Sequence, residues 1–187
     1  MTIRKAVLPV AGLGTRVLPA TKAIPKELLP VVDRPALQYV VDEAVEAGIE
    51  HIVFVTGRGK SAIEDYFDLA FELEANLSSK PSKAAGGASF TRQQEALGLG
   101  HAIWCARDII GNEPFAILLP DVIVKAEKSC LAQMVEAFDR VGGNIIAVDP
   151  VPEDRVSAYG VIAPKGERDG RLIEMSGMVE KPPREEA

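Results

Sequence analysis

Between residues 4 and 75 the apolar positions follow strand and helix periods in turn. Residues 4–10 and His51–Thr56 are short apolar runs, typical of strands that are buried on both faces. Pro35–Ala47 and Lys60–Ala75 repeat their apolar residues at helical spacing. The succession of strand, turn, helix, strand and helix predicts an α/β fold of the doubly wound kind.

The second part of the chain continues this pattern after an interruption. Residues 78–89 are small and polar, which predicts a flexible connection. Beyond them the sequence predicts, in order, a strand at 90–94, a helix at Leu99–Ile109, a strand at Phe115–Leu119, a helix at Leu131–Val141, a strand at Asn144–Asp149, and two strands, Tyr159–Ala163 and Leu172–Val179, which form a hairpin around Lys165–Gly170. Trp104 and Phe115 are expected in the core.

Composition places the chain among ordinary globular proteins. Its 187 residues are 47% hydrophobic and 26% charged, which suits one domain covering residues 1–187. Cys105 and Cys130 have no disulfide or metal-ligand spacing and are expected to be reduced thiols. The first residues contain no apolar signal-peptide core, and no run is long enough to span a membrane. We therefore expect a cytoplasmic protein with no membrane partner.

Charge is distributed unevenly along the chain. Residues 1–34 carry six lysines and arginines against two acidic residues, although the whole chain has a net charge of −6. A basic segment in an acidic protein indicates a small polyanion bound locally. It argues against nucleic acid as a partner, because such proteins carry extended basic surfaces.

The first predicted strand runs into a turn that carries Gly12, Gly14, Thr15 and Arg16, with Lys26 shortly afterwards. Glycines let the backbone approach a ligand closely, and exposed N–H groups suit phosphate oxygens. A dinucleotide-binding fingerprint is excluded, because its third glycine position holds Val17. A tight turn without a ligand is the alternative. The cations beside the turn favour phosphate binding by these residues.

A second glycine-rich segment, Thr56–Ser61, ends in Gly-Lys-Ser like a P-loop. The leading glycine that a P-loop requires falls at Phe54, so this segment is predicted to be a turn that begins the next helix.

Asp121 closes a predicted strand at Leu118-Leu119-Pro120. In open α/β sheets ligands bind beyond the carboxyl ends of strands, where a carboxylate can hold Mg²⁺ on a triphosphate. The alternative is an aspartate that only caps a turn. Lys181 is a candidate cation for a second phosphorylated substrate, and we interpret His51 and His101 as structural.

Several blocks of this sequence resemble the family of bacterial UTP–glucose-1-phosphate uridylyltransferases. The blocks follow the order of the family: Pro-Val-Ala-Gly-Leu-Gly-Thr-Arg (9–16), Pro-Ala-Thr-Lys (19–22), Pro-Lys-Glu (25–27), Leu-Pro-Val-Val-Asp-Arg-Pro (29–35), Gly-Leu-Gly-His-Ala (98–102), Leu-Pro-Asp-Val (119–122), Ala-Tyr-Gly-Val (158–161) and Val-Glu-Lys-Pro (179–182). Thymidylyltransferases usually have Ser-Lys-Gln where this chain has Pro-Lys-Glu, which favours the uridylyl branch.

The resemblance implies a Rossmann-like nucleotide-diphospho-sugar transferase fold, with a mostly parallel sheet flanked by helices. It implies a Mg²⁺-dependent reaction in which UTP and glucose 1-phosphate give UDP-glucose and pyrophosphate. The roles that it implies are nucleotide contacts for Ala11 and Gly12, charge neutralisation for Arg16 and Lys26, uracil binding for Gln93 with space left by Gly98, Mg²⁺ binding for Asp121, and sugar-phosphate binding for Gly160, Glu180 and Lys181.

The chain departs from the family in two places. The connection at 78–89 is shorter than in most relatives, and family members continue beyond residue 187. The resemblance places further sugar contacts, a second acidic metal ligand and much of the interface of a homo-oligomer in that continuation. A non-catalytic nucleotide-binding fragment, or a thymidylyltransferase, is therefore the alternative function.

Overall fold

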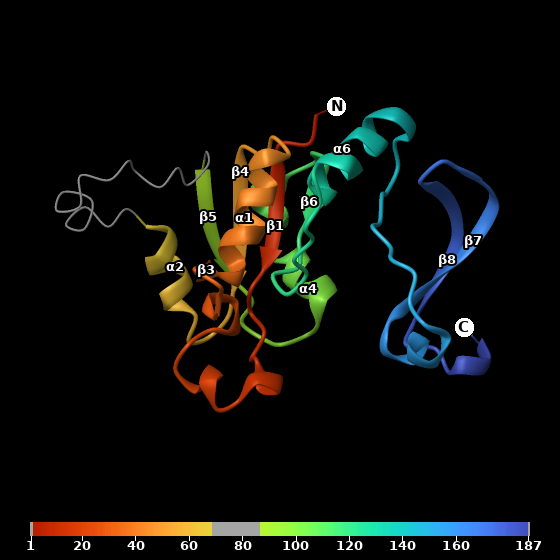
Figure 1. Ribbon diagram of the computed structural model, residues 1–187. Helices are drawn as coiled ribbons and strands as arrows, with labels where there is room; N and C mark the ends of the chain where they lie inside the picture. The colour runs from red at the N-terminus through yellow and green to blue at the C-terminus, as the bar shows by residue number, and fades with distance from the viewer. Residues whose placement is uncertain (1, 69–86, 187) are drawn as a thin grey trace. The chain divides into compact units, whose positions relative to one another are not determined.

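The computed structural model describes residues 2–68 and 87–186 (Figure 1). Contacts between Cα atoms divide the chain into two compact units, Met1–Asp139 and Arg140–Ala187, and each unit is described by itself. A single domain over residues 1–187 stays a prediction. In the described ranges, no helix has both the length and the apolar character needed to cross a membrane.

The first unit contains the α/β elements. In chain order they are β1 (Lys5–Pro9), the 3₁₀ turns η1 (Thr15–Val17), η2 (Ala20–Lys22) and η3 (Lys26–Leu28), β2 (Pro30–Val31), β3 (Arg34–Pro35), α1 (Ala36–Glu46), β4 (His51–Thr56), α2 (Ser61–Phe67), β5 (Gly87–Arg92), α4 (Leu99–Trp104), α5 (Arg107–Ile110), β6 (Phe115–Ile117) and α6 (Cys130–Val141). The last helix runs on into the second unit.

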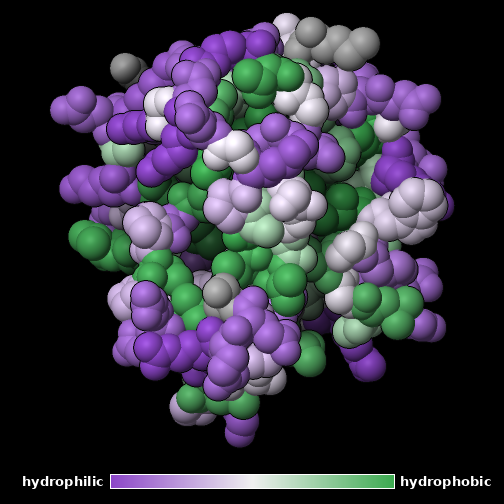
Figure 2. Space-filling view, turned by 90° about the vertical axis from the view of Figure 1, so that its right-hand side faces the viewer, coloured by the Kyte–Doolittle hydropathy of each residue, from purple (hydrophilic) through white to green (hydrophobic). Residues whose placement is uncertain are grey.

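The second unit is built on one antiparallel hairpin. Strands β7 (Gly160–Asp169) and β8 (Leu172–Glu180) pair from Gly160↔Glu180 to Asp169↔Leu172, and the 3₁₀ turns η4 (Glu153–Ala158) and η5 (Arg184–Glu186) flank them. Most positions on both strands are exposed. Figure 2 shows that hydrophobic side chains lie at the surface among hydrophilic ones on the face that it presents.

Four parallel strands form the sheet of the first unit, in the order β5-β4-β1-β6. The chain adds β4 and then β5 on one side of β1, and returns to add β6 on the other side. This order confirms the predicted doubly wound α/β fold. It also puts the topological switch point between β1 and β6, where ligands bind at the carboxyl ends of the strands.

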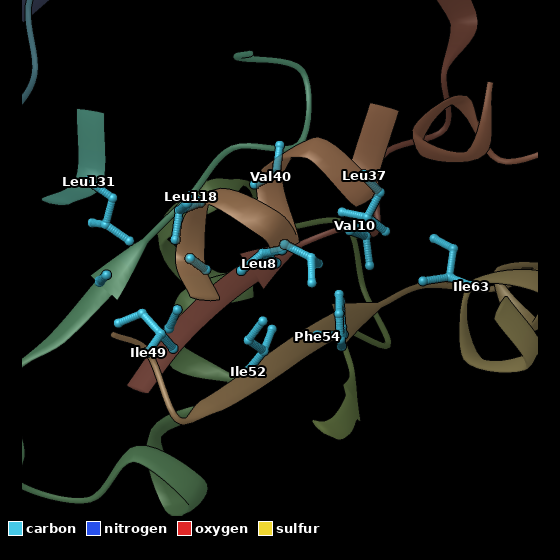
Figure 3. Packing of buried hydrophobic residues seen from close by; sticks show 14 of the residues in the cluster. Leu8, Val10, Leu37, Val40, Ile49, Ile52, Phe54, Ile63, Leu118 and Leu131 are labelled. Carbon is cyan, nitrogen blue, oxygen red and sulfur yellow. The ribbon is translucent and has the colours of Figure 1, made fainter. Parts of the chain in front are cut away.

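Helices cover both faces of this sheet. Alternate residues of β1 and β4, such as Leu8 and Phe54, pack in one cluster with apolar side chains of α1, α2 and α6 (Figure 3). The intervening residues, such as Val7 and Val53, pack in a second cluster with α4 and α5. Strands buried on both faces explain why β1 and β4 read as continuous apolar runs in the sequence.

Several predicted boundaries are wrong. The predicted strand 90–94 is β5, which begins at Gly87, so residues 87–89 of the predicted flexible connection are strand paired to β4. Residues 78–86 of that connection, and 69–75 of the predicted helix before it, lie outside the described residues. The predicted helix 99–109 is two helices, α4 and α5, separated at Cys105–Ala106.

Three further predictions are wrong: the strand at 144–149, the hairpin turn at Lys165–Gly170, and the core position of Trp104. Residues 144–149 form no strand, because they have no ladder partner among the described residues. The hairpin turn lies at Gly170–Arg171, after β7 has continued through Lys165. Trp104 is 61% exposed and stacks with the Arg107 guanidinium instead of entering the core.

The thiols agree with their prediction. Cys105 and Cys130 are both free and partly buried. Burial raises the pKa of the Cys130 thiol, and the Glu43 carboxylate raises that pKa further. Both effects favour the protonated form of the thiol, which is the less reactive one.

The hairpin of β2 and β3 carries a strained residue at its tip. Val32 has a φ of 64° and is 95% exposed. A β-branched residue is strongly disfavoured at positive φ, and an exposed side chain gains no packing in return. We expect Val32→Gly to raise the free energy of unfolding by about 1 kcal/mol, because relief of strain exceeds the entropy cost of glycine.

Urea denaturation measures this effect. Val31→Gly is the matched control, because Val31 is a paired strand residue opposite Arg34 and its replacement lowers stability. A loss of stability in both variants would show that Val32 is not strained.

Candidate functional site

The candidate site lies at the carboxyl ends of β1 and β6. β1 and β6 pair in parallel, and Leu118 N donates to Val7 O at 3.1 Å, so their exits lie side by side. On the other side of β1, Val10 N donates to Val55 O of β4 at 2.9 Å. The loop after β1 holds the predicted phosphate-binding turn, and the loop after β6 holds Asp121. The two segments therefore meet at the switch point of the sheet.

The turn after β1 is closed at Gly14. Its φ of 66° lies in the left-handed region, and its carbonyl accepts hydrogen bonds from Val17 N at 3.0 Å and Thr21 Oγ1 at 2.8 Å. A Cβ at this position would lie 3.0 Å from Thr21 Cγ2 and 3.2 Å from Lys26 Cβ. Both the positive φ and this crowding favour glycine at position 14. Thr15 and Arg16 follow in η1. The Arg16 side chain is exposed and makes no ion pair within the described part of the chain.

The turn after β4 packs against the same loop. A Cβ on Gly57 would lie 3.0 Å from the Ala11 carbonyl oxygen and 3.3 Å from Ala11 Cα. Gly57 is thus needed for close approach of two backbones, and the residues after it begin α2 as the sequence predicts. The resemblance of this segment to a P-loop is accidental.

Lys26 crosses the glycine turn and reaches the other strand end. An added Cβ on Gly12 would lie 3.6 Å from Lys26 Cε and 4.0 Å from its Nζ. The same Nζ donates to Asp121 Oδ2 at 3.0 Å. The Lys26 side chain is 26% exposed and that of Asp121 is 61% exposed, so solvent and ligands can reach both groups. Gly12, Lys26 and Asp121, which are far apart in sequence, are therefore in one place.

Gln93 and Gly98 also lie together. Gln93 follows β5, and its Nε2 donates to Gly98 O at 3.0 Å and lies 3.1 Å from His101 Nδ1. Its Oε1 makes no hydrogen bond to any residue in the described ranges. The amide thus presents a free acceptor, and His101 is a neighbour that orients it.

The three residues predicted for a sugar phosphate lie at one end of the hairpin in the second unit. Gly160 pairs with Glu180, and a Cβ on Gly160 would lie 3.2 Å from Glu180 Oε2. Lys181 donates its backbone N–H to Tyr159 O at 3.0 Å, and its Nζ lies 3.3 Å from Glu180 Oε1. Lys181 has a φ of 48°, a strained conformation that is frequent at functional sites.

One buried ion pair beside the site was not predicted from the sequence. Lys60 Nζ donates to Glu27 Oε2 at 2.7 Å, and the two side chains are 6% and 1% exposed. Both residues lie in segments that look polar and solvated, 33 positions apart. The only local signal was the adjacency of Glu27 to Lys26, and that signal does not identify a partner.

Comparisons with known proteins agree with the fold and with the blocks found in the sequence. The family model of nucleotidyl transferases matches residues 5–187. A UTP–glucose-1-phosphate uridylyltransferase of Komagataeibacter xylinus is 50% identical over 191 residues, covering 96% of this chain and 67% of the relative. The chain spans about two thirds of the length of the curated relatives it matches.

Solved structures are similar over the whole chain. A UTP-bound UGPase from Acinetobacter baumannii gives a TM-score of 0.89 at 46% identity, covering 100% of this chain and 70% of that one. A UDP-glucose pyrophosphorylase complexed with UDP-glucose gives 0.87 at 42% identity, covering 100% and 72%. The family resemblance and the fold class predicted from the sequence are thereby confirmed.

Proposed function

The chain belongs to the nucleotidyl transferase family, and from that premise we propose that it transfers the uridylyl group of UTP to glucose 1-phosphate. The products are UDP-glucose and pyrophosphate. The observation that carries this proposal is the 3.0 Å pair of Lys26 and Asp121 beside Gly12, at the switch point of the sheet. A cation and a carboxylate beside a glycine turn are the groups that a triphosphate and its metal require.

The triphosphate binds along the loop after β1. Backbone N–H groups at Ala11 and Gly12 meet phosphate oxygens, and the closed turn at Gly14 and Thr15 holds that loop in shape. Arg16, exposed and free of ion pairs with described residues, supplies one positive charge and Lys26 supplies another.

Asp121 fits a magnesium site of the kind that substrates complete. Among the described residues, no three His, Cys, Asp or Glu side chains gather into a metal site of their own. Mg²⁺ bound to nucleotides usually takes one or two carboxylates and several phosphate oxygens, and Asp121 offers one accessible carboxylate. When bound there, Mg²⁺ would neutralise charge on the triphosphate.

The reaction is an in-line displacement at the α-phosphorus of UTP. A phosphate oxygen of glucose 1-phosphate forms the new P–O bond, the bond to the β-phosphate oxygen breaks, and its electron pair leaves with pyrophosphate. This displacement requires little proton transfer, so alignment and charge neutralisation carry the rate. Lys26 stabilises the charge that develops on the departing pyrophosphate.

Recognition of the two substrates uses further residues. The free Oε1 of Gln93 accepts a hydrogen bond from uracil N3–H, while cytosine offers an acceptor at that atom and is rejected. Gly98 leaves room for the base. Gly160, Glu180 and Lys181 hold the sugar phosphate, with Glu180 toward hydroxyl groups and Lys181 toward the phosphate.

One assay tests the function. The protein is incubated with UTP, glucose 1-phosphate and Mg²⁺, and UDP-glucose and pyrophosphate are measured, with CTP and dTTP in parallel. We expect both products from UTP and little from CTP. Binding of UTP without pyrophosphate release would make the protein a nucleotide-binding module. A preference for dTTP would make it a thymidylyltransferase.

A further inference from the structure

The buried ion pair of Lys60 and Glu27 connects two segments that both border the candidate site. Glu27 belongs to η3, which is one turn of 3₁₀ helix, and Lys60 ends the turn between β4 and α2. The Nζ–Oε2 distance is 2.7 Å, and both side chains are almost fully buried. The contact is therefore fixed by the fold and is not a solvated surface pair.

This ion pair is expected to contribute little to the stability of the fold. Glu27 Oε1 is buried with no hydrogen-bond partner among the described residues, so part of the carboxylate is desolvated without compensation. Removing two charges from water costs more than an imperfect pair returns, and well-packed apolar residues often do as well or better. A role other than stability accounts for the pair more simply.

The neighbours of the pair indicate that role. Lys26 immediately precedes Glu27 in η3, and two backbone hydrogen bonds hold that turn, from Leu28 N to Pro25 O and from Leu29 N to Lys26 O. One turn of 3₁₀ helix is too short to fix its own orientation. With Glu27 anchored inward, Lys26 extends to the other side, across Gly12 to Asp121.

Through the same ion pair, Lys60 also holds the turn between β4 and α2, which borders the site. It lies in the turn that contains Gly57, and Gly57 packs against Ala11. The segment bearing Lys26 and the turn supporting the nucleotide loop are thus joined by one buried interaction.

We propose that the Glu27–Lys60 ion pair is a positioning device, which holds the Lys26 ammonium in place over the glycine turn. Glu27 and Lys60 touch no substrate and act through Lys26. The consequence for catalysis rests on the proposed function, whereas the positioning of Lys26 does not.

The test replaces the pair by apolar side chains in Glu27→Leu/Lys60→Met. This variant leaves no unpaired buried charge, so it is expected to keep the melting temperature of the parent protein. We expect kcat for UDP-glucose formation to fall about 10-fold with little change in KM, as when a positioning partner of an active-site group is lost. In a Lys26→Ala background the same replacement should lower kcat less than about 2-fold further, because residues that act as one unit are not additive.

Lysine labelling gives a second readout that does not depend on activity. Acetic anhydride modification followed by mass spectrometry measures the reactivity of Lys26, which should increase several-fold in the double variant, as in Lys60→Met alone. Ile110→Ala is the matched control. Ile110 belongs to α5, is only 3% exposed, and packs in the second hydrophobic cluster, on the other face of the sheet. It lowers the melting temperature and leaves kcat and Lys26 labelling unchanged.

The outcomes separate the two proposals. Parental kcat and parental Lys26 labelling in the double variant would overturn the positioning role, and so would full additivity with Lys26→Ala. A parent protein that forms no UDP-glucose would refute the proposed function, and the labelling experiment would still decide whether the pair positions Lys26.

Discussion

We expect Lys26→Ala to lower the turnover of UTP and glucose 1-phosphate at least about 100-fold while the fold stays intact. Lys26 is the charged group that crosses Gly12 and reaches Asp121 at the switch point. Loss of one well-placed donor to the transition state costs ~3 kcal/mol, on the order of 100-fold in rate. Steady-state kinetics of UDP-glucose formation measures the loss.

Stability is expected to change little in the same variant. The Lys26–Asp121 pair is partly exposed, and such pairs contribute about 0–1 kcal/mol to folding. Lys165→Ala is the matched control, since it removes a lysine from an exposed pair with Glu174 at 2.9 Å and lies outside the proposed site. A normal rate in Lys26→Ala would remove Lys26 from the mechanism. An equal loss in Lys165→Ala would point to a general effect of charge.

The fold was predictable where the pattern of apolar residues in an element matches its burial in the structure. β1 and β4 are buried on both faces, so their apolar runs mark them as central parallel strands. The turn at Gly14 was predictable because a positive φ and a crowded Cβ position both demand glycine. In each case the residues of the element itself carry a clear signal.

Predictions were wrong where the cause lies elsewhere in the chain. Residues 144–149 have the composition of a strand, but a strand also needs a neighbour with free backbone groups. Trp104 looks like a core residue, yet its helix turns it toward Arg107 and solvent. Composition gives a preference, and tertiary contacts decide the outcome.

In the candidate site, too, local features were predictable and long-range contacts were not. The closeness of Gly12 and Asp121 was predictable, because each follows a strand and the carboxyl ends of parallel strands share one edge of a sheet. Their direct connection through Lys26 was not predictable, since it depends on how η3 is oriented. That orientation involves the buried contact of Glu27 with Lys60, a long-range interaction between residues that look solvated in the sequence.

Asp121→Asn is expected to lower turnover about 100-fold at a fixed Mg²⁺ concentration. Asparagine keeps the size of the side chain and removes its negative charge, so a divalent cation at the proposed site would lose the carboxylate that Asp121 supplies. A metal ion contributes several kcal/mol of charge stabilisation to phosphoryl transfer, which makes a loss of ~3 kcal/mol reasonable. Activity is measured as a function of total Mg²⁺, with EDTA-treated protein as the starting point.

The Mg²⁺ titration distinguishes Asp121 from Lys26, although the two groups touch. Asp121→Asn should raise the Mg²⁺ concentration for half-maximal activity at least about 10-fold, and added Mg²⁺ should recover part of the rate. Lys26→Ala should lower the maximum and leave that concentration unchanged, because a lysine cannot be a metal ligand at neutral pH. Asp108→Asn, at an 82% exposed side chain, is the matched control and should resemble the parent. If Asp121→Asn lowers the maximum without shifting the Mg²⁺ dependence, the carboxylate orients Lys26 and binds no metal.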